Sequence, residues 1–142
     1  MNPAPEFLLF EDDFGDAGLI QEAVSQAGLV CQWNHADNGE RALGLIERVA
    51  ANDLEAALII VDINLPRRDG KELLRTMRAN ARFDKIPIIV ATGSLNPRER
   101  EEALALGADG FFNKPSSYEA YMELGSLVKR LLHQSGVDKG PA

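Results

Sequence analysis

Apolar and polar positions alternate in blocks along the chain, and each block has the period of either a strand or a helix. Continuous apolar runs of four to eight residues are typical of buried parallel strands. We predict strands at residues 6–11, 29–36, 56–61, 87–93 and 110–113. A segment with apolar residues at helical spacing follows each run. We predict a first helix that carries Ile20, Ala23, Val24 and Ala27 at helical spacing, and further helices at residues 37–50, 70–80, 96–107 and 116–133.

Parallel neighbours need crossover connections, so strict alternation of strands and helices predicts a doubly wound five-stranded parallel sheet with five helices, α/β in class. Gly28 is a plausible end of the first helix. Ser116 or Ser117 is the expected N-cap of the last helix. Residues 1–142 are expected to form one domain with its core at about 6–132, and the tail 133–142 is expected to be flexible.

Composition narrows the class of protein. The chain has 142 residues, of which 45% are hydrophobic and 26% charged, the balance of a soluble globular domain. Its net charge of -7 argues against a nucleic-acid partner. The start MNPAPEFLLFEDD has neither a basic signal region nor a membrane-spanning run. The lone Cys31 excludes an internal disulfide, which suits a reducing cytoplasm. From these two features we expect a cytoplasmic protein without a membrane partner.

Polar residues stand at the ends of four predicted strands. In chain order they are Glu11, Asp12 and Asp13, then Asp62 and Asn64, then Thr92, then Asn113 and Lys114. In a doubly wound sheet the carboxyl ends of the strands share one edge, where ligands bind. We therefore expect these side chains to form one site.

The chemistry of this set points to phosphoryl transfer. Carboxylates crowded at one edge repel each other, so a proton or a cation must join them, and oxygen ligands suit Mg²⁺. Lys114 and Thr92 supply an ammonium and a hydroxyl that can hold phosphoryl oxygens. Asp62 is the expected nucleophile, since a carboxylate can form an aspartyl phosphate.

The motifs EDD at 11–13, VDINLPRRDG at 61–70, ATG at 91–93 and FFNKP at 111–115 resemble the receiver domain of two-component response regulators. This CheY-like resemblance spans residues 6–132 and implies a flavodoxin-like fold. It implies that a sensor histidine kinase or a histidine phosphotransfer protein donates the phosphoryl group. The family is a signalling class rather than a class of turnover enzymes; only self-phosphorylation and self-dephosphorylation of Asp62 are implied.

Roles follow from the resemblance residue by residue. The resemblance implies that Asp62 is the phospho-acceptor and that Glu11 and Asp12 are the acidic metal pair, with the main-chain carbonyl of Asn64 as a further Mg²⁺ ligand. It also implies that Lys114 is the phosphoryl-binding lysine, Thr92 the switch hydroxyl and Phe111 the switch aromatic. The family often has a cis bond at this position, which implies a cis Lys114–Pro115 bond. The fourth helix, fifth strand and fifth helix form the usual signalling face, through which a homodimer is possible.

Part of the sequence resembles one group of response regulators in particular. The long segment before the third strand, with PRRDG and IQEA, is similar to single-domain regulators that partner bacterial phytochromes. Only ten residues follow Leu132, so we expect no output domain in this chain.

Two other functions remain open. A phosphatase of the haloacid-dehalogenase type also uses an Asp nucleophile, Mg²⁺, a hydroxyl and a Lys, but its motif has an acid where this chain has Asn64. A pseudo-receiver that only binds partners is the other alternative, although that class usually lacks one of the acids.

Overall fold

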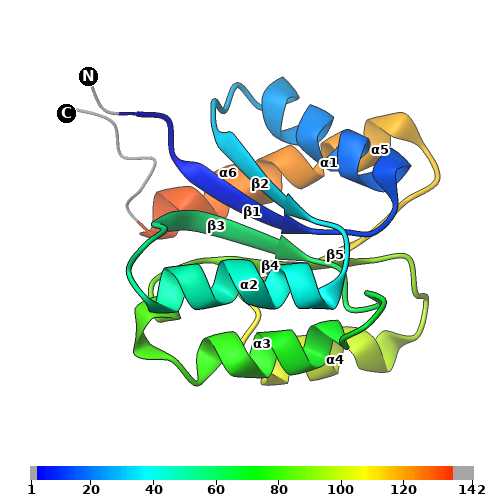
Figure 1. Cartoon of the computed structure of the whole chain (residues 1–142). Coiled ribbons are helices and arrows are strands. Elements are labelled where there is room, and N and C mark those ends of the chain that lie inside the picture. The colour runs from blue at the N-terminus through cyan, green and yellow to red at the C-terminus, as the bar shows by residue number, and fades with distance from the viewer. Residues whose placement is uncertain (1–2, 136–142) are drawn as a thin grey trace.

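Five parallel strands form one sheet in the computed structural model, which describes residues 3–135 (Figure 1). Their order is β2-β1-β3-β4-β5. The strands are β1 at Glu6–Phe10, β2 at Gln32–Ala36, β3 at Ala56–Val61, β4 at Ile88–Thr92 and β5 at Gly110–Asn113. The doubly wound parallel sheet predicted from the sequence is confirmed.

Helices cover both faces of this sheet. They are α1 at Phe14–Gln26, α2 at Gly39–Ala50, α3 at Gly70–Arg78, α4 at Pro97–Ala105, α5 at Tyr118–Met122 and α6 at Leu124–Ser135, with a short 3₁₀ helix η1 at Ala81–Phe83. An Asp, Asn or Ser side chain caps the first turn of each of α1 to α5 by accepting a backbone N–H, which explains where these helices start. None of the helices in residues 3–135 has the length and hydropathy to cross a membrane.

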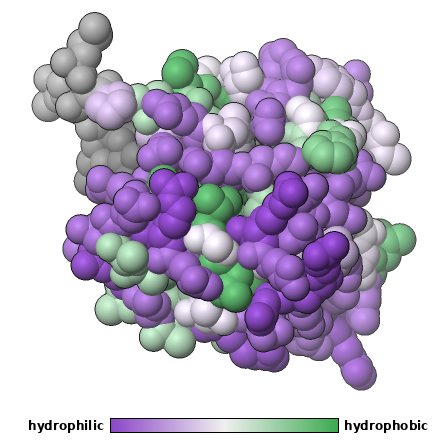
Figure 2. Space-filling view, viewed as in Figure 1, coloured by the Kyte–Doolittle hydropathy of each residue, from purple (hydrophilic) through white to green (hydrophobic). Residues whose placement is uncertain are grey.

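The core has two apolar layers because successive strand residues point to opposite faces. Leu8 and Phe10 of β1 pack toward α2 and α3, whereas Phe7 and Leu9 pack toward α1 and the last two helices. All four side chains are fully buried. The face of the molecule shown in Figure 2 is mainly hydrophilic, with an apolar area near its middle and smaller apolar areas around its edges.

The last predicted helix is divided at Glu123. The Glu123 N–H donates to Ala120 O at 3.2 Å and the Ser126 N–H to Glu123 O at 3.1 Å, which are three-residue rather than four-residue steps. Gly125 lies against α1 at this break, where a Cβ atom would stand 2.4 Å from Ala23 O. Close packing against α1 therefore accompanies a break in an otherwise uniform helical pattern.

Three smaller expectations were wrong. The strand predicted from residue 29 begins at Gln32, because Gly28 at φ +83° and the Leu29 N–H, bonded to Val24 O, still belong to the end of α1. Residues 133–135, predicted to belong to a flexible tail, are the end of α6; residues 136–142, the rest of the predicted tail, lie outside the described part of the chain. The Lys114–Pro115 bond is trans, the ordinary isomer even before proline.

Candidate functional site

The sheet order places the ends of β1 and β3 side by side. These two strands are neighbours, and the direction in which further strands are added reverses between them, which is where doubly wound folds bind ligands. The Asp62 N–H donates to Phe10 O at 2.9 Å, and the Glu11 N–H donates to Ala36 O at 3.0 Å, so the parallel ladder continues into the residues after the strands. Glu11 and Asp62 are thus fixed by main-chain bonds at the centre of the sheet edge.

Three carboxylates gather there. Glu11, Asp12 and Asp62 each offer one oxygen, and these oxygens lie within 4.8 Å of one another. Glu11 is 1% exposed and Asp62 is 6% exposed, whereas Asp12 faces solvent. Glu11 Oε1 is buried without a hydrogen-bond donor. An open, oxygen-only donor set of this kind fits a hard divalent cation such as Mg²⁺.

The Lys114 ammonium lies among the carboxylates. Its Nζ is 2.6 Å from Glu11 Oε1 and 2.9 Å from Asp62 Oδ2, and it also lies 3.2 Å from Asp16 Oδ2. The bonds to Asp62 and Asp16 have hydrogen-bond geometry, while the Glu11 contact is an ion pair outside donor alignment. One buried cation therefore neutralises part of the charge of this site.

Burial and charge shift the protonation of two of these groups. Burial raises the pKa of Glu11 from 4.5 to about 7, and Asp62 adds to the increase while Lys114 opposes it. Burial by itself lowers the pKa of Lys114, but the contacts with Asp62 and Glu11 outweigh it and raise that pKa. Lys114 therefore stays charged, and the buried Glu11 carboxylate binds a proton more readily than an exposed one.

Asn64 connects Asp62 to Thr92. Its N–H donates to Asp62 Oδ1 at 2.8 Å, and its side-chain Nδ2 donates to Thr92 Oγ1 at 3.1 Å. Thr92 is fully buried, and its hydroxyl also accepts the Ser94 N–H at 3.2 Å. The side chain of Asn64 was not singled out from the sequence, where only its main chain was given a role.

Phe111 lies on β5, half-buried, apart from the carboxylates. It pairs in register with Val90, and both belong to the apolar layer that faces α2, α3 and α4. Thr92 is two residues after Val90 on β4, so it points to the same face as Phe111. The structure thus places the two expected switch residues on adjacent strands and on one face.

Two further residues reach the site without having been identified from the sequence. Asp16 contacts Lys114 from the first turn of α1, and Tyr121 of α5 donates its hydroxyl to Asp16 Oδ1 at 3.1 Å. An acid in a first turn is ordinarily explained by the helix dipole, and a buried Tyr by the core. No local pattern distinguished this pair, because their meeting with Lys114 depends on tertiary structure.

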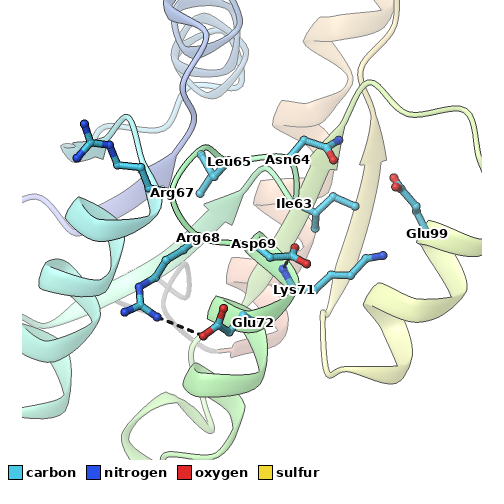
Figure 3. A pocket seen from close by; sticks show the side chains of 9 residues that line it. All are labelled: Ile63, Asn64, Leu65, Arg67, Arg68, Asp69, Lys71, Glu72 and Glu99. Carbon is cyan, nitrogen blue, oxygen red and sulfur yellow. Dashed lines mark hydrogen bonds and ion pairs between the residues drawn. The ribbon is translucent and has the colours of Figure 1, made fainter.

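A cavity of about 630 Å³ opens beside Asn64 (Figure 3). Three cations line it, and each is paired: Arg68 with Glu72 at 3.2 Å, Lys71 with Glu102 at 2.6 Å, and Arg67 with Glu40 at 3.5 Å. Asp69, Glu72 and Glu99 also line the cavity. Its charges are balanced, so charge alone does not favour an anionic ligand there.

Comparison with known proteins identifies relatives over most of the chain. Residues 7–124 match the response regulator receiver domain family. The transcriptional regulatory protein GltR of Pseudomonas aeruginosa is 34% identical over 128 residues, which are 90% of this chain and 49% of GltR. The response regulator Rcp1 of Synechocystis is 31% identical over 97 residues, or 67% of this chain and 66% of Rcp1. The chain thus spans about half the length of GltR.

Solved structures show the same fold. The phosphorylated cyanobacterial phytochrome response regulator RcpA superimposes with a TM-score of 0.80 at 22% identity, covering 94% of this chain and 96% of RcpA. One of the structural neighbours is therefore a phytochrome response regulator. This chain belongs to the family of response regulator receiver domains, the CheY-like receivers of two-component signalling.

Proposed function

We propose that this receiver accepts a phosphoryl group on Asp62 from a phosphohistidine of a sensor histidine kinase or histidine phosphotransfer protein. One observation carries the proposal: the same buried carboxylate belongs to the acidic trio with Glu11 and Asp12 and is hydrogen-bonded to Lys114 at 2.9 Å. The nucleophile, the metal-ligand candidates and the counter-charge are therefore in one place.

The step needs little from the protein beyond positioning and charge. An Asp62 oxygen forms a bond to phosphorus while the phosphorus–nitrogen bond of the phosphohistidine breaks. The electron pair stays on the imidazole nitrogen, which then takes up a proton from water. Lys114 lies where it can stabilise the phosphoryl oxygens, and the Asn64 N–H holds the other Asp62 oxygen at 2.8 Å.

Glu11, Asp12 and Asp62, with the main-chain carbonyl of Asn64, are the residues we expect to hold Mg²⁺. Bound there, the ion would offset the negative charge shared by the carboxylates and the incoming phosphoryl group. The oxygen-only donor set supports this assignment, as does Glu11 Oε1, which is buried and accepts no hydrogen bond although it lies 2.6 Å from the Lys114 ammonium.

The direct test is covalent labelling of Asp62. With Mg²⁺ and acetyl phosphate, the wild-type protein is expected to gain one acid-stable, base-labile phosphoryl group, measured by intact mass. Asp62→Asn is expected to gain none, because the amide is not a nucleophile of this kind. Asp53→Asn, a change at an exposed residue, is the matched control. Labelling of Asp62→Asn at the wild-type rate would show that the acceptor is another residue.

The two alternatives give different results in the same assay. A phosphatase would release phosphate continuously from many small phosphomonoesters, whereas a receiver stops after one labile self-phosphorylation. A pseudo-receiver would bind partners without any labelling. The Asn64 side chain opposes the phosphatase, because it is an amide that donates to Thr92 rather than a second acid.

The signal is proposed to leave through a switch of Thr92 and Phe111. Phosphoryl oxygens on Asp62 can attract the Thr92 hydroxyl away from Asn64, and the Phe111 ring, which has no polar atom to satisfy, can move inward on the same face. This movement would change the face formed by α4, β5 and the last two helices, α5 and α6, where a partner or a second copy can dock.

Beryllofluoride with Mg²⁺, a stable phosphoryl mimic, tests this route. We expect it to change self-association or amide exchange in α4, and we expect Thr92→Ala to remove that change without preventing phosphorylation. Identical association and exchange with and without the mimic would contradict the switch.

A further inference from the structure

The Lys114 ammonium pairs with three carboxylates that differ in burial, donating hydrogen bonds to Asp62 and Asp16 and forming an ion pair with Glu11. Glu11 and Asp62 lie on its buried side, whereas the Asp16 side chain is 29% exposed and gives the longest contact, 3.2 Å. Glu11 and Asp62 come from strand ends, but Asp16 comes from α1. Lys114 thus connects the sheet edge to a helix that contributes none of the proposed metal ligands.

Asp16 is in turn connected to α5. Its Oδ1 accepts the Tyr121 hydroxyl at 3.1 Å while its Oδ2 accepts Lys114. Tyr121 is 2% exposed, and its ring lies 5.6 Å from that of Phe112 on β5, so it is fixed by packing. Burial and the neighbouring Asp16 carboxylate both raise the pKa of Tyr121, so its hydroxyl remains a donor.

A phosphoryl group on Asp62 changes the balance of forces on Lys114. It replaces one negative charge by roughly two and adds three strong acceptor oxygens at the buried side of the ammonium. Attraction to the partly exposed Asp16 is weakened by solvent, whereas attraction to buried oxygens is not. Lys114 is therefore drawn toward the phosphoryl group and away from Asp16.

We propose that Asp16 is a positioning residue for Lys114 and that the Asp16–Tyr121 hydrogen bond carries the phosphorylation state of Asp62 to α5. The inference rests on the proposed phosphoryl acceptance at Asp62. It describes a route on the α1 and α5 side of the sheet, opposite to the face that holds Thr92 and Phe111. Asp16 that has lost Lys114 turns toward solvent, and α5 loses an anchor to α1.

Amide hydrogen exchange of residues 119–124, with and without beryllofluoride and Mg²⁺, tests this route. In the wild-type protein the mimic is expected to accelerate exchange about tenfold, the effect of losing one hydrogen bond to a charged group. Tyr121→Phe keeps the buried ring and removes only the hydroxyl. In this variant and in Asp16→Ala we expect the response to the mimic to fall below about twofold, while the response of α4 persists.

Tyr118→Phe is the matched control. The Tyr118 hydroxyl also joins α5 to α1, through Glu22 at 3.3 Å, but Glu22 pairs with Gln26, whereas Asp16 pairs with Lys114. This variant is expected to retain the wild-type response. An undiminished response in both Tyr121→Phe and Asp16→Ala, or an equal loss in Tyr118→Phe, would overturn the proposed route.

Two further measurements distinguish a failure of the α5 route from a failure of phosphoryl acceptance at Asp62. They are fluorine NMR of bound beryllofluoride and labelling with acetyl phosphate. A wild-type protein that binds the mimic and is labelled on Asp62, but whose α5 exchange does not change, contradicts the route alone. A protein that neither binds the mimic nor is labelled contradicts phosphoryl acceptance, and the route with it.

Discussion

Glu11 has an unusual environment for a carboxylate. It is almost fully buried, one of its oxygens has no hydrogen-bond donor, and its nearest cation, Lys114, is shared with two other acids. Burial raises its pKa to about 7, and the contact with Lys114 does not offset this increase. A buried group with a raised pKa binds a proton in the folded state that the unfolded chain does not bind at the same pH.

Glu11→Gln is therefore expected to change the pH dependence of stability. The folded-state pKa of about 7 exceeds the ordinary 4.5, so this contribution to stability is complete below 4.5 and is lost as the pH rises through 7. Between about pH 5 and about pH 8, the metal-free wild type is expected to lose roughly 1–3 kcal/mol relative to Glu11→Gln. Urea unfolding in the presence of a chelator measures the difference. Glu47→Gln, on the surface of α2, is the control.

Parallel pH profiles for the wild type and Glu11→Gln would contradict this expectation. So would a wild type that gains stability relative to Glu11→Gln as the pH rises, because the sign of the difference would then be reversed.

At the scale of elements, the close contact between α1 and α6 depends on Gly125, which has no side chain. A Cβ atom at Gly125 would lie 2.4 Å from the Ala23 carbonyl oxygen, and backbone cannot yield as a flexible side chain can. The small residue lets the two helices approach directly after the break at Glu123. Packing rather than helix propensity therefore explains the choice of glycine here.

Gly125→Ala is expected to destabilise the fold by about 1–3 kcal/mol, because overpacking must push α6 from α1. Gly44→Ala is the matched control, since Gly44 also lies within a helix but a Cβ there would meet nothing within 4 Å. It is expected to stabilise by about 0.5–1 kcal/mol through helix propensity. Chemical denaturation of both variants measures the two changes in the free energy of unfolding, which are expected to have opposite signs. A neutral or stabilising Gly125→Ala would show that the helices can separate at little cost.

The sequence predicted elements well where local patterning and tertiary structure agree. The strands at Ala56–Val61 and Gly110–Asn113 match their predicted bounds, because an apolar run and its turn residues mark both ends. The break at Glu123 could not be predicted, since the helical pattern runs through it and the packing that accompanies it involves the distant Ala23. The late start of β2 was missed because Leu29 is apolar and reads as strand, although it completes the end of α1.

At the scale of the whole molecule, the carboxylate trio makes metal binding and stability one equilibrium. Glu11, Asp12 and Asp62 come from two strands, and their repulsion acts on the folded state only. A cation that binds them stabilises that state by mass action, by about 2.7 kcal/mol at a hundred times its dissociation constant.

Asp12→Ala is expected to weaken Mg²⁺ binding while leaving the metal-free protein no less stable, because it removes both a ligand and a source of repulsion. Thermal unfolding across a Mg²⁺ titration measures both effects. Asp53→Ala, far from the trio in an exposed ion pair, is expected to keep the wild-type response. Equal Mg²⁺ affinity in Asp12→Ala and wild type would remove Asp12 from the ligand set.

The candidate site was predictable to the extent that it consists of strand ends. The carboxyl ends of parallel strands share one edge of the sheet, so the strands alone predicted that Asp62, Glu11, Asp12 and Lys114 would lie together. The structure places these side chains together. The Asn64 amide bond to Thr92 was not predictable, because a side chain's direction within a loop is decided by its neighbours. The same holds for Asp16 and Tyr121, which come from helices.

The long separation of the Lys114 contacts along the chain has a consequence for folding. Lys114 reaches Asp62 across 52 positions and Asp16 across 98. Contacts of such separation form only after the intervening loops have been closed, so they belong to the late part of folding. Glu11 and Asp62 are themselves far apart in the sequence, so a partly folded chain has assembled neither the acidic trio nor the ammonium beside it. Under the proposed function, we therefore expect the kinase to phosphorylate Asp62 only in molecules that have completed their fold. Folding intermediates would not be found among the phosphorylated molecules.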